Sequence, residues 1–358
     1  MNRKSGKDEP ASPIQLRRGA EVTIRDVARA LNISHTTVSR ALADSPIISE
    51  ETKVRVRSVA EQLGYVPSAS ARSMRGRRSS LVALMVPDIQ NDFYAAVAKV
   101  VANSLAARSM HLMLSITDDD PVRELRELHV ILEMRPAGLI LVPTAGLQAE
   151  TEALLGNVRT VQLLRKHPKV RGTAVLVDDR HGIYIATRQL LDYGHKRIAY
   201  IGNGSEISTG RERLAGFQQA LAERNLQPAS VMLGAPRPEF ARHAVTAIMT
   251  GKSKPTGLIL AGPELTLGAM QALRGLRLEW PRDVSLIGYH DPAWFEMAEH
   301  GITTVRLPVE DIAVTAASLL ISEAMEPPSE QEDVQEPTEV VFTPALILRG
   351  STAPLGVR

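Results

Sequence analysis

The chain of 358 residues contains no cysteine, which excludes a disulfide framework and any metal site built from thiolates. No run of apolar residues reaches the length of a transmembrane helix. The N-terminal residues 1–21 carry basic side chains with no apolar run behind them, which argues against a secretory signal. We therefore expect a cytoplasmic protein that begins with a disordered basic tail.

The sequence motifs of several large enzyme classes are also missing. There is no phosphate-binding P-loop, no dinucleotide fingerprint after a strand, no HExxH zinc motif and no GxSxG nucleophile turn. The histidines of the middle and second half of the chain are scattered without metal-ligand spacing, and we expect a structural hydrogen bond for His195. We therefore predict that the chain is not an enzyme and needs neither a cofactor nor a metal.

The charge is unevenly distributed, although the formal net charge is only +2. Residues 1–80 contain 15 Lys+Arg against 8 Asp+Glu, whereas the remainder contains 27 against 32. This balance indicates a polyanionic partner for the N-terminal region alone. A solvated basic tail would give the same balance, but Arg72, Arg75, Arg77 and Arg78 cluster beside a helix-turn-helix pattern.

Residues 22–67 have the pattern of a helix-turn-helix followed by a third helix. Thr23 with Asp26 three residues later forms a variant capping box at the first helix. Asn32 tolerates the left-handed conformation that the turn needs, and Ser34 can cap the second helix. A module of this kind places its second helix in the major groove of DNA.

The exposed side of the second helix carries the candidate DNA contacts. Recognition helices use their N-terminal residues on base edges, so we predict that His35 and Thr36 read bases. Arg40 would reach a base or a phosphate. Hydroxyl groups that could bind phosphates are those of Thr23, Ser34, Thr37 and Ser39.

From Leu81 onward, short apolar runs alternate with helical patterns. This alternation predicts an α/β core with parallel sheets and helices on both faces, and such sheets bind ligands at the carboxyl ends of their strands. The acidic, proline-rich residues 326–339 predict a loose insertion. The side-by-side Asp178 and Asp179 should point to opposite faces, leaving Asp178 as a candidate lining residue.

The segments VTIRDVARALNIS, TTVSRAL and LGYVPSASARSM together resemble the head of the LacI/GalR family of bacterial transcription regulators. LVALMVPDIQNDFY, GRERLAGFQQAL and PRDVSLIGYHD extend the resemblance over about residues 22–350. It implies a small all-α DNA-binding head at 22–67, a hinge at 68–79 and a core at 80–350. That core would be two-lobed and periplasmic-binding-protein-like.

The resemblance also implies where the core divides into lobes. Three crossovers would join lobe one, at about 80–193 and 306–326, to lobe two, at about 194–303 and 339–349. Residues 351–358 would remain as a tail.

In this family the hinge folds into a short helix on the operator, and paired apolar residues from two subunits open the minor groove. The corresponding residue is Met74, where the family usually has leucine; methionine is also apolar. Arg72 and Arg75 beside it would hold phosphates, and Ser68 stands where the family often has asparagine. A plain flexible linker is the alternative for this segment.

For the cleft between the lobes, the resemblance points to Arg213 as the effector-binding arginine and to Phe93 as an aromatic stacking residue. Asp88 lies on the same loop as Phe93. The family commonly shows Asn-Asp where this chain has Gly262-Pro263. It also shows a carboxylate pair where this chain has His290-Asp291, so Asp291 remains the one candidate carboxylate of that pair.

These departures affect the expected ligand. Losing a carboxylate and gaining His290 favours an anionic effector such as a sugar acid. If binding requires a protonated His290, affinity should rise as the pH falls through the histidine range. A cleft that has drifted to weak or no binding would explain the same departures.

We therefore expect a homodimeric regulator, more specifically a repressor, with near-palindromic operator DNA and a sugar, sugar acid or sugar phosphate as its partners. No heptad repeat follows the core, so no tetramerisation helix is expected. One alternative is a small-molecule-binding protein whose head no longer reads specific DNA. Another is a carbohydrate-active enzyme, which the lack of suitable carboxylate geometry disfavours.

Overall fold

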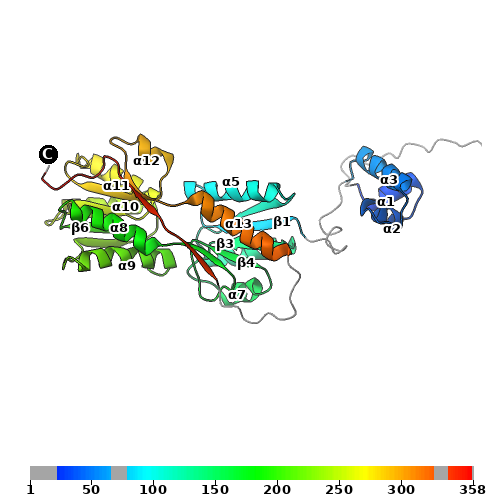
Figure 1. Cartoon of the computed structure of the whole chain (residues 1–358), viewed down its shortest axis with the longest axis horizontal. Helices are drawn as coiled ribbons and strands as arrows, with labels where there is room; N and C mark the ends of the chain where they lie inside the picture. Colours follow the sequence, from blue (N-terminus) through cyan, green and yellow to red (C-terminus); the bar gives the residue numbers. More distant parts are fainter. Residues whose placement is uncertain (1–21, 66–78, 326–337, 357–358) are drawn as a thin grey trace, which may run out of the picture. The chain divides into compact units, whose positions relative to one another are not determined.

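The computed structural model describes residues 22–65, 79–325 and 338–356, and the chain divides into two compact units at Arg78/Ser79 (Figure 1). The basic tail at 1–21, most of the hinge and most of the acidic insertion lie outside the described residues. We call residues 22–65 the head and the second unit the core. Each is described separately.

The head consists of α1 (Ile24–Leu31), α2 (His35–Leu42) and α3 (Glu50–Gln62). They enclose a small core of fully or nearly buried side chains: Val27, Ala28, Val38, Ala41, Val56 and Ala60. The turn between α1 and α2 uses Asn32 at φ 52°, and both halves of the Thr23–Asp26 capping box are present. The predicted turn at Asn32 and the predicted capping box at Thr23 are therefore both confirmed.

The third helix does not bury all of its apolar residues. Val54 is 61% exposed. Lys53 is buried instead, and its ammonium group lies 2.6 Å from Glu50 and 3.2 Å from Asp44. The long lysine stem packs inward while its charge is neutralised at the edge.

The first lobe is a sheet with strand order β11-β5-β4-β3-β1-β2. All its pairings are parallel. Its strands are β1 (Leu81–Val86), β2 (His111–Ile116), β3 (Gly138–Leu141), β4 (Thr160–Leu163), β5 (Ala174–Val177) and β11 (Glu339–Phe342). Its helices are α5 (Asp92–Ala106), α6 (Pro121–Glu133), α7 (Ala149–Leu155) and α13 (Val309–Met325).

Alternation along β1 shows how the helices cover both faces of this sheet. Val82, Leu84 and Val86 belong to the cluster that includes α5 and α13 residues, and these two helices lie side by side (Figure 1). Ala83 and Met85 belong instead to the cluster with residues of α6 and α7. A strand buried on both faces explains the unbroken apolar run in the sequence.

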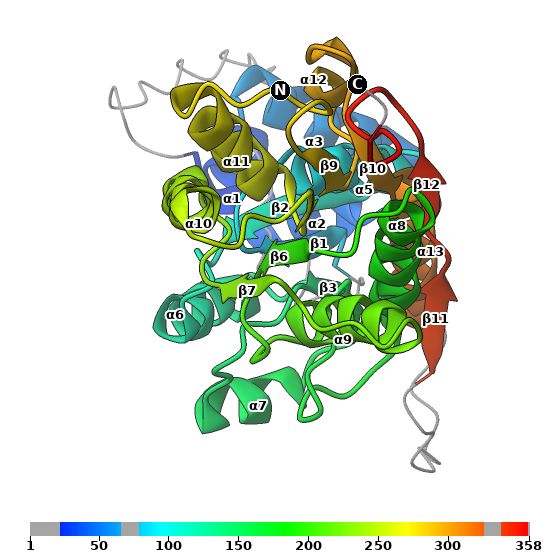
Figure 2. The same ribbon diagram turned by 90° about the vertical axis from the view of Figure 1, so that its left-hand side faces the viewer.

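The second lobe repeats this design with strand order β12-β10-β9-β8-β6-β7. Its strands are β6 (Ile198–Gly202), β7 (Ser230–Leu233), β8 (Gly257–Leu260), β9 (Ser285–Tyr289), β10 (Thr303–Arg306) and β12 (Ala345–Ile347), with β12 antiparallel to β10. Its helices are α8 (Asp179–Asp192), α9 (Ser208–Ala222), α10 (Pro238–Thr250), α11 (Pro263–Gly275) and α12 (Ala293–Met297). In Figure 2, α10 and α11 lie on one side of β6, and α8 and α9 on the other.

The structure corrects three boundaries of the predicted lobes. Helix α8, expected in lobe one, packs on α9 and on strands of the second sheet, so the first crossover follows β5 directly. Residues 339–349 are split, because β11 pairs with β5 in the first sheet while β12 pairs with β10 in the second. Strand β10 extends to Arg306, which we had placed at the start of the returning lobe-one segment.

The C-terminal residues also differ from the prediction of a tail. Ser351 is completely buried, and its hydroxyl donates to the Leu286 carbonyl at 2.7 Å and accepts from the Thr303 amide at 2.8 Å. His195 contacts the Ala353 carbonyl through Nε2 and Thr256 through Nδ1, each at 3.0 Å. This confirms a structural role for His195 and shows that residues 351–353 complete the second lobe.

Candidate functional site

The exposed surface of α2 carries the predicted base-reading residues. His35, Thr36 and Arg40 are all exposed, and Thr36 and Arg40 are one helical turn apart on the same side of α2. The helix begins at Ser34, whose Oγ accepts the Thr37 amide hydrogen at 3.0 Å. The N-terminal turn of α2 therefore presents both polar side chains and the positive end of the helix dipole to solvent.

Three of the four hydroxyl groups that we expected on phosphates already have partners within the head. Thr23 Oγ1 donates to Asp26 at 2.6 Å, and Ser34 and Thr37 share a hydrogen bond at 2.8 Å. Ser39 is half-buried on the helix side. A phosphate would thus meet Thr23, Ser34 and Thr37 as parts of preformed helix caps. The hinge candidates Ser68, Arg72, Met74 and Arg75 lie outside the described residues.

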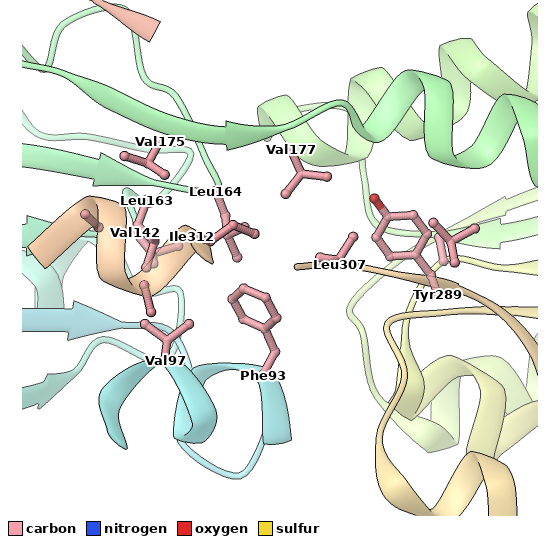
Figure 3. Packing of buried hydrophobic residues seen from close by; sticks show 14 of the residues in the cluster. Phe93, Val97, Val142, Leu163, Leu164, Val175, Val177, Tyr289, Leu307 and Ile312 are labelled. Carbon is pink, nitrogen blue, oxygen red and sulfur yellow. The ribbon is translucent and has the colours of Figure 1, made fainter. Parts of the chain in front are cut away.

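A second candidate site is a cavity of about 210 Å³ between the two lobes of the core, which we call the cleft. Loops that follow the carboxyl ends of strands in both sheets line it, as parallel sheets of this kind predict. Of the predicted effector residues, Asp88 and Phe93 reach it from the first lobe, and Arg213 and His290 from the second. Figure 3 shows Phe93 of α5 and Tyr289 of β9 on the two sides of the junction between the lobes.

Asp291 does not line the cleft. Its carboxylate binds Arg349 at 2.7 and 3.0 Å and Arg306 Nε at 2.8 Å. These two arginines hold the pKa of Asp291 below its usual range despite partial burial. Because both oxygens serve this ion-pair network, Asp291 fastens the end of β9 to β10 and to the C-terminal segment.

The carboxylate that binds Arg213 is Asp179. Arg213 Nε donates to Asp179 Oδ1 at 2.7 Å, and Arg213 Nη1 donates to the Ala261 carbonyl at 3.1 Å. The guanidinium carbon also lies 4.0 Å from the centre of the Tyr289 ring, and the Tyr289 hydroxyl donates to the same Asp179 oxygen. Sequence reasoning noted Asp178 instead, but Asp178 caps α8 by accepting the His181 amide hydrogen.

This arrangement fixes the charge of Arg213. Burial would lower the pKa of Arg213, but the adjacent Asp179 carboxylate outweighs burial and raises it. The guanidinium therefore stays protonated and is held rigidly at the edge of the cleft. An aromatic face and a carboxylate on the same cation are typical of a preorganised arginine.

The surroundings of His290 disfavour the positive charge that we expected it to gain for an acidic ligand. Burial lowers the pKa of His290 well below its usual value, and the positive charge of Arg213 lowers it further. Its ring lies 5.0 Å from that of Phe93, which belongs to the other lobe. Its Nδ1 is buried without a hydrogen-bond partner among the described residues. The low pKa of His290 argues against its protonation in the histidine range, and the expected pH dependence of binding stays a prediction.

Sequence reasoning missed several polar side chains of the cleft. Arg165 follows β4 and forms a two-pronged ion pair with Asp119, one contact of which measures 2.9 Å. Tyr94 and Thr209 also line the cavity, as does Glu264 in the first turn of α11. The position of Asp119 and Arg165 just after strands of one sheet was a signal that could have identified them.

Glu264 has an unusual environment. Its side chain is half-buried, and it accepts a hydrogen bond from its own backbone N–H. Burial raises the pKa of Glu264, and the negative charges of Asp88 and Asp92 raise it further. Glu264 thus belongs to a negative region on one side of the cleft.

The two lobes touch at the edge of the cleft. The Lys166 amide of the first lobe donates to Ser208 Oγ of the second at 3.0 Å.

Among the described residues, no group of three or more His, Cys, Asp or Glu side chains is placed to hold a metal ion. In the same part of the chain, every helix is too short or too polar to span a membrane.

Comparison with known proteins gives two family matches. Residues 23–68 match bacterial regulatory proteins of the lacI family, and residues 187–352 match a periplasmic binding protein-like domain. The transcriptional regulator GalR of Salmonella typhimurium is 30% identical over 338 residues, covering 92% of this chain and 96% of GalR. The transcriptional repressor PurR of Haemophilus influenzae is 28% identical over 333 residues, covering 92% and 98%.

Among solved structures, the lac repressor dimer bound to operator and the anti-inducer ONPF is similar to this chain with a TM-score of 0.77. The match covers 93% of this chain and all of the repressor chain at 20% identity. At that identity the likeness shows the fold: a helix-turn-helix head and a two-lobed α/β core. The relatives named above are regulators of transcription, which agrees with the prediction that the chain is not an enzyme.

Proposed function

The chain belongs to the LacI family of DNA-binding transcription regulators, and from this premise we propose that it is a homodimeric repressor controlled by a small molecule bound in the cleft. The observation that carries the proposal is the pairing of an exposed polar α2 surface in the head with a polar cavity between the lobes of the core. One unit offers a surface for DNA, and the other a site for a ligand of limited size.

For the head, we propose that His35 and Thr36 read base edges and that Arg40 contacts a base or a phosphate. Their exposure at the start and on one side of α2 supports these roles. Thr23, Ser34, Thr37 and Ser39 would contribute phosphate contacts together with the amide groups at the helix N-terminus. Two heads of a dimer would then recognise half-sites related by a two-fold axis.

For the segment between the units, we propose that residues 68–79 order on DNA and that Met74 enters the minor groove, flanked by Arg72 and Arg75. The resemblance of SASARSM to the family hinge is the support for this assignment. Met74→Ala should weaken binding to the operator more than binding to random DNA. An equal loss on both DNAs would show that the segment is only a tether.

For the core, we propose that the ligand is a sugar or a related polar molecule of similar size, which changes how the lobes close. Contacts between the lobes, such as Lys166 with Ser208 and Phe93 with His290, are the ones that closure would alter. Asp88, Phe93, Arg213 and His290 line the cavity and are the proposed ligand contacts. Operator DNA lies in the cytoplasm of a bacterium, and we expect the protein to act there.

The test is a selection of random DNA duplexes on the full-length protein, followed by sequencing. We expect enrichment of one sequence with two-fold related half-sites, and binding that falls steeply with salt because the head neutralises phosphates. Absence of any enriched sequence would favour the alternative, a small-molecule-binding protein that reads no specific DNA. Addition of a bound ligand should then release or tighten the selected duplex.

A further inference from the structure

The two buried arginines that line the cleft, Arg213 and Arg165, are each paired with an aspartate. Arg213 is bound to Asp179, and Arg165 is bound to Asp119 through two contacts. Arg213 and Arg165 are only 7% and 6% exposed. A buried ion pair has little net charge, so these arginines offer N–H donors to a ligand and contribute little attraction for an anion.

Two acids of the cleft have no basic partner among the described residues. Asp88, on the loop after β1, accepts a hydrogen bond from the Gln90 amide at 2.8 Å. Glu264, at the start of α11, is held by its own backbone N–H. Asp88 belongs to the first lobe and Glu264 to the second, so they approach the same cavity from opposite sides.

The remaining cation of the cavity lies at its edge. Arg237 precedes α10, and its side chain is exposed to solvent, which screens its charge. Asp88 is exposed in the same way, so the least screened of the unpaired charges that line the cavity is the half-buried carboxylate of Glu264. The negative charges of Asp88 and Asp92 act on Glu264, since both raise its pKa.

Two neutral polar groups of the cavity also lack partners. The Thr209 side chain is 7% exposed and makes no side-chain hydrogen bond among the described residues. His290 Nδ1 is buried and also has no hydrogen-bond partner among the described residues. A ligand hydroxyl that reaches either group would supply the missing partner, and a buried polar atom such as His290 Nδ1 is costly to leave unpaired.

From these contacts we propose that the cleft binds a small molecule that carries a protonated amino group together with hydroxyl groups. Asp88 and Glu264 receive the amino group, while Thr209, His290 and the free N–H groups of the two arginines receive the hydroxyls. This inference rests on the cleft being the effector site and names the chemical class of its ligand. It replaces the anionic effector that the sequence suggested.

The size of the cleft limits the ligand further. Its volume of about 210 Å³ is below the range of roughly 300–1,000 Å³ that is usual for drug-sized ligands. A molecule of the size of one amino sugar fits this limit. Phe93 and Tyr94 supply aromatic surface on the first-lobe side, which suits the carbon face of such a ring and a nearby cation.

Isothermal titration calorimetry of the full-length protein at pH 7 would test the charge class directly. The probes are three matched sets, each comprising the amine, the neutral sugar and the uronic acid: glucosamine, glucose and glucuronate, with the galactose and mannose counterparts. We expect the tightest ligand to be an amine that binds about tenfold or more tightly than the neutral sugar of the same configuration, because charged hydrogen bonds are the stronger ones.

Two variants separate this charge effect from shape. Glu264→Gln removes the charge but keeps the size of the side chain, so the ratio of amine to neutral affinity should fall towards one. Glu239→Gln removes an exposed carboxylate of α10 in the same lobe and should leave every affinity unchanged. If Glu264→Gln reduces Tm strongly, Asp88→Asn on the exposed loop provides the same measurement from the other lobe.

Tightest binding by a neutral sugar or a uronic acid, an amine preference that survives Glu264→Gln and Asp88→Asn, or no binding by any of the nine probes would each overturn the inference. The proposed function is tested separately by duplex selection on the same preparation. Selected DNA without amine binding would leave the regulator in place and reject the ligand class. Amine binding without selected DNA would support the ligand class and reject the role as a DNA-binding regulator.

Discussion

In the head, the Ser34 hydroxyl caps a helix by binding the Thr37 amide three residues away, and both groups are near solvent. In the cleft, Arg213 binds Asp179 and the Ala261 carbonyl, which are 34 and 48 residues away, and all three residues are buried. The polar groups of the head are thus positioned by neighbours in the sequence, whereas those of the cleft are positioned by the packing of several elements. Substitution of a polar residue should therefore have local effects in the head, whereas in the core it should destabilise several packed elements.

The largest expected effect comes from breaking the buried pair of the cleft. Asp179→Ala leaves the Arg213 charge buried without a partner, so the free energy of unfolding of the core should fall by about 3–5 kcal/mol. Urea unfolding followed by tryptophan fluorescence measures this, because Trp280 and Trp294, the two tryptophans of the chain, belong to the second lobe.

The control for that experiment lies on the same helix. Asp192 at the end of α8 pairs with Arg224 at 2.8 Å, but both side chains are about half exposed. Asp192→Ala should therefore lower the free energy of unfolding by only about 0–1 kcal/mol. Equal losses in the two variants would mean that burial does not distinguish the cleft from the surface.

A smaller effect is expected for DNA binding when the exposed α2 residues are changed. Arg40→Ala, or replacement of His35 and Thr36 by the pair of another regulator, should weaken binding to the selected operator by about 1–3 kcal/mol for each base that is no longer read. The folding stability of the head should change by less than about 0.5 kcal/mol, since these side chains are exposed. Gel-shift titrations with operator and random duplexes measure the binding, and thermal unfolding measures the stability.

An unchanged operator preference after the His35 and Thr36 replacement would reject their assignment as base readers. Glu61→Gln, at an exposed position near the end of α3, serves as the matched control and should alter neither operator preference nor stability.

Loss of a single cap should be smaller still and confined to the head. Ser34→Ala removes the acceptor for the Thr37 amide, which should cost about 1 kcal/mol of helix stability. Amide hydrogen exchange should show faster exchange in the first turn of α2, with no change in the core. Ser49→Ala provides the comparison, because Ser49 caps α3 by the same geometry at a longer distance of 3.4 Å. Faster exchange across the core sheets would contradict the separation of the two units.

Mild acid should distinguish the two regions without any substitution. Burial lowers the pKa of His290 and His195 in the core below the ordinary histidine value of 6.5. The unfolded chain therefore binds protons first, and the core should lose stability as the pH falls below about 6.5 towards the folded values.

In the head, hydrogen bonds from Thr23 lower the pKa of Asp26, and contacts with Lys53 lower that of Asp44, each from 3.8. These two aspartates stabilise the head at pH values above 3.8, and this stabilisation is lost only as the pH falls below 3.8. Hydrogen exchange measured at pH values of about 7, 6 and 5, across the histidine range, should accordingly show weaker protection in the core before any change in the head. Simultaneous loss in both would contradict this order.

The sequence by itself determined the head and the class of the core. The capping box at Thr23, the left-handed Asn32 and the Ser34 cap depend on residues within three or four positions, so pattern reasoning could find them. The unbroken apolar runs and the intervening helical patterns likewise predicted parallel sheets covered on both faces. The roles assigned to residues outside the described ranges, such as that of Met74, remain predictions.

Only the tertiary structure decided which polar side chains meet in the cleft. Asp179 binds Arg213, whereas the candidate Asp291 lies away from the cavity. Burial lowers the pKa of His290, and Glu264 and Arg165 come from elements far apart in the chain. The physical reason is that crossovers after β5, β10 and β11 exchange segments between lobes, so contacts depend on the order of strands in each sheet. Burial and neighbouring charge, which set the protonation of these groups, exist only once those sheets have assembled.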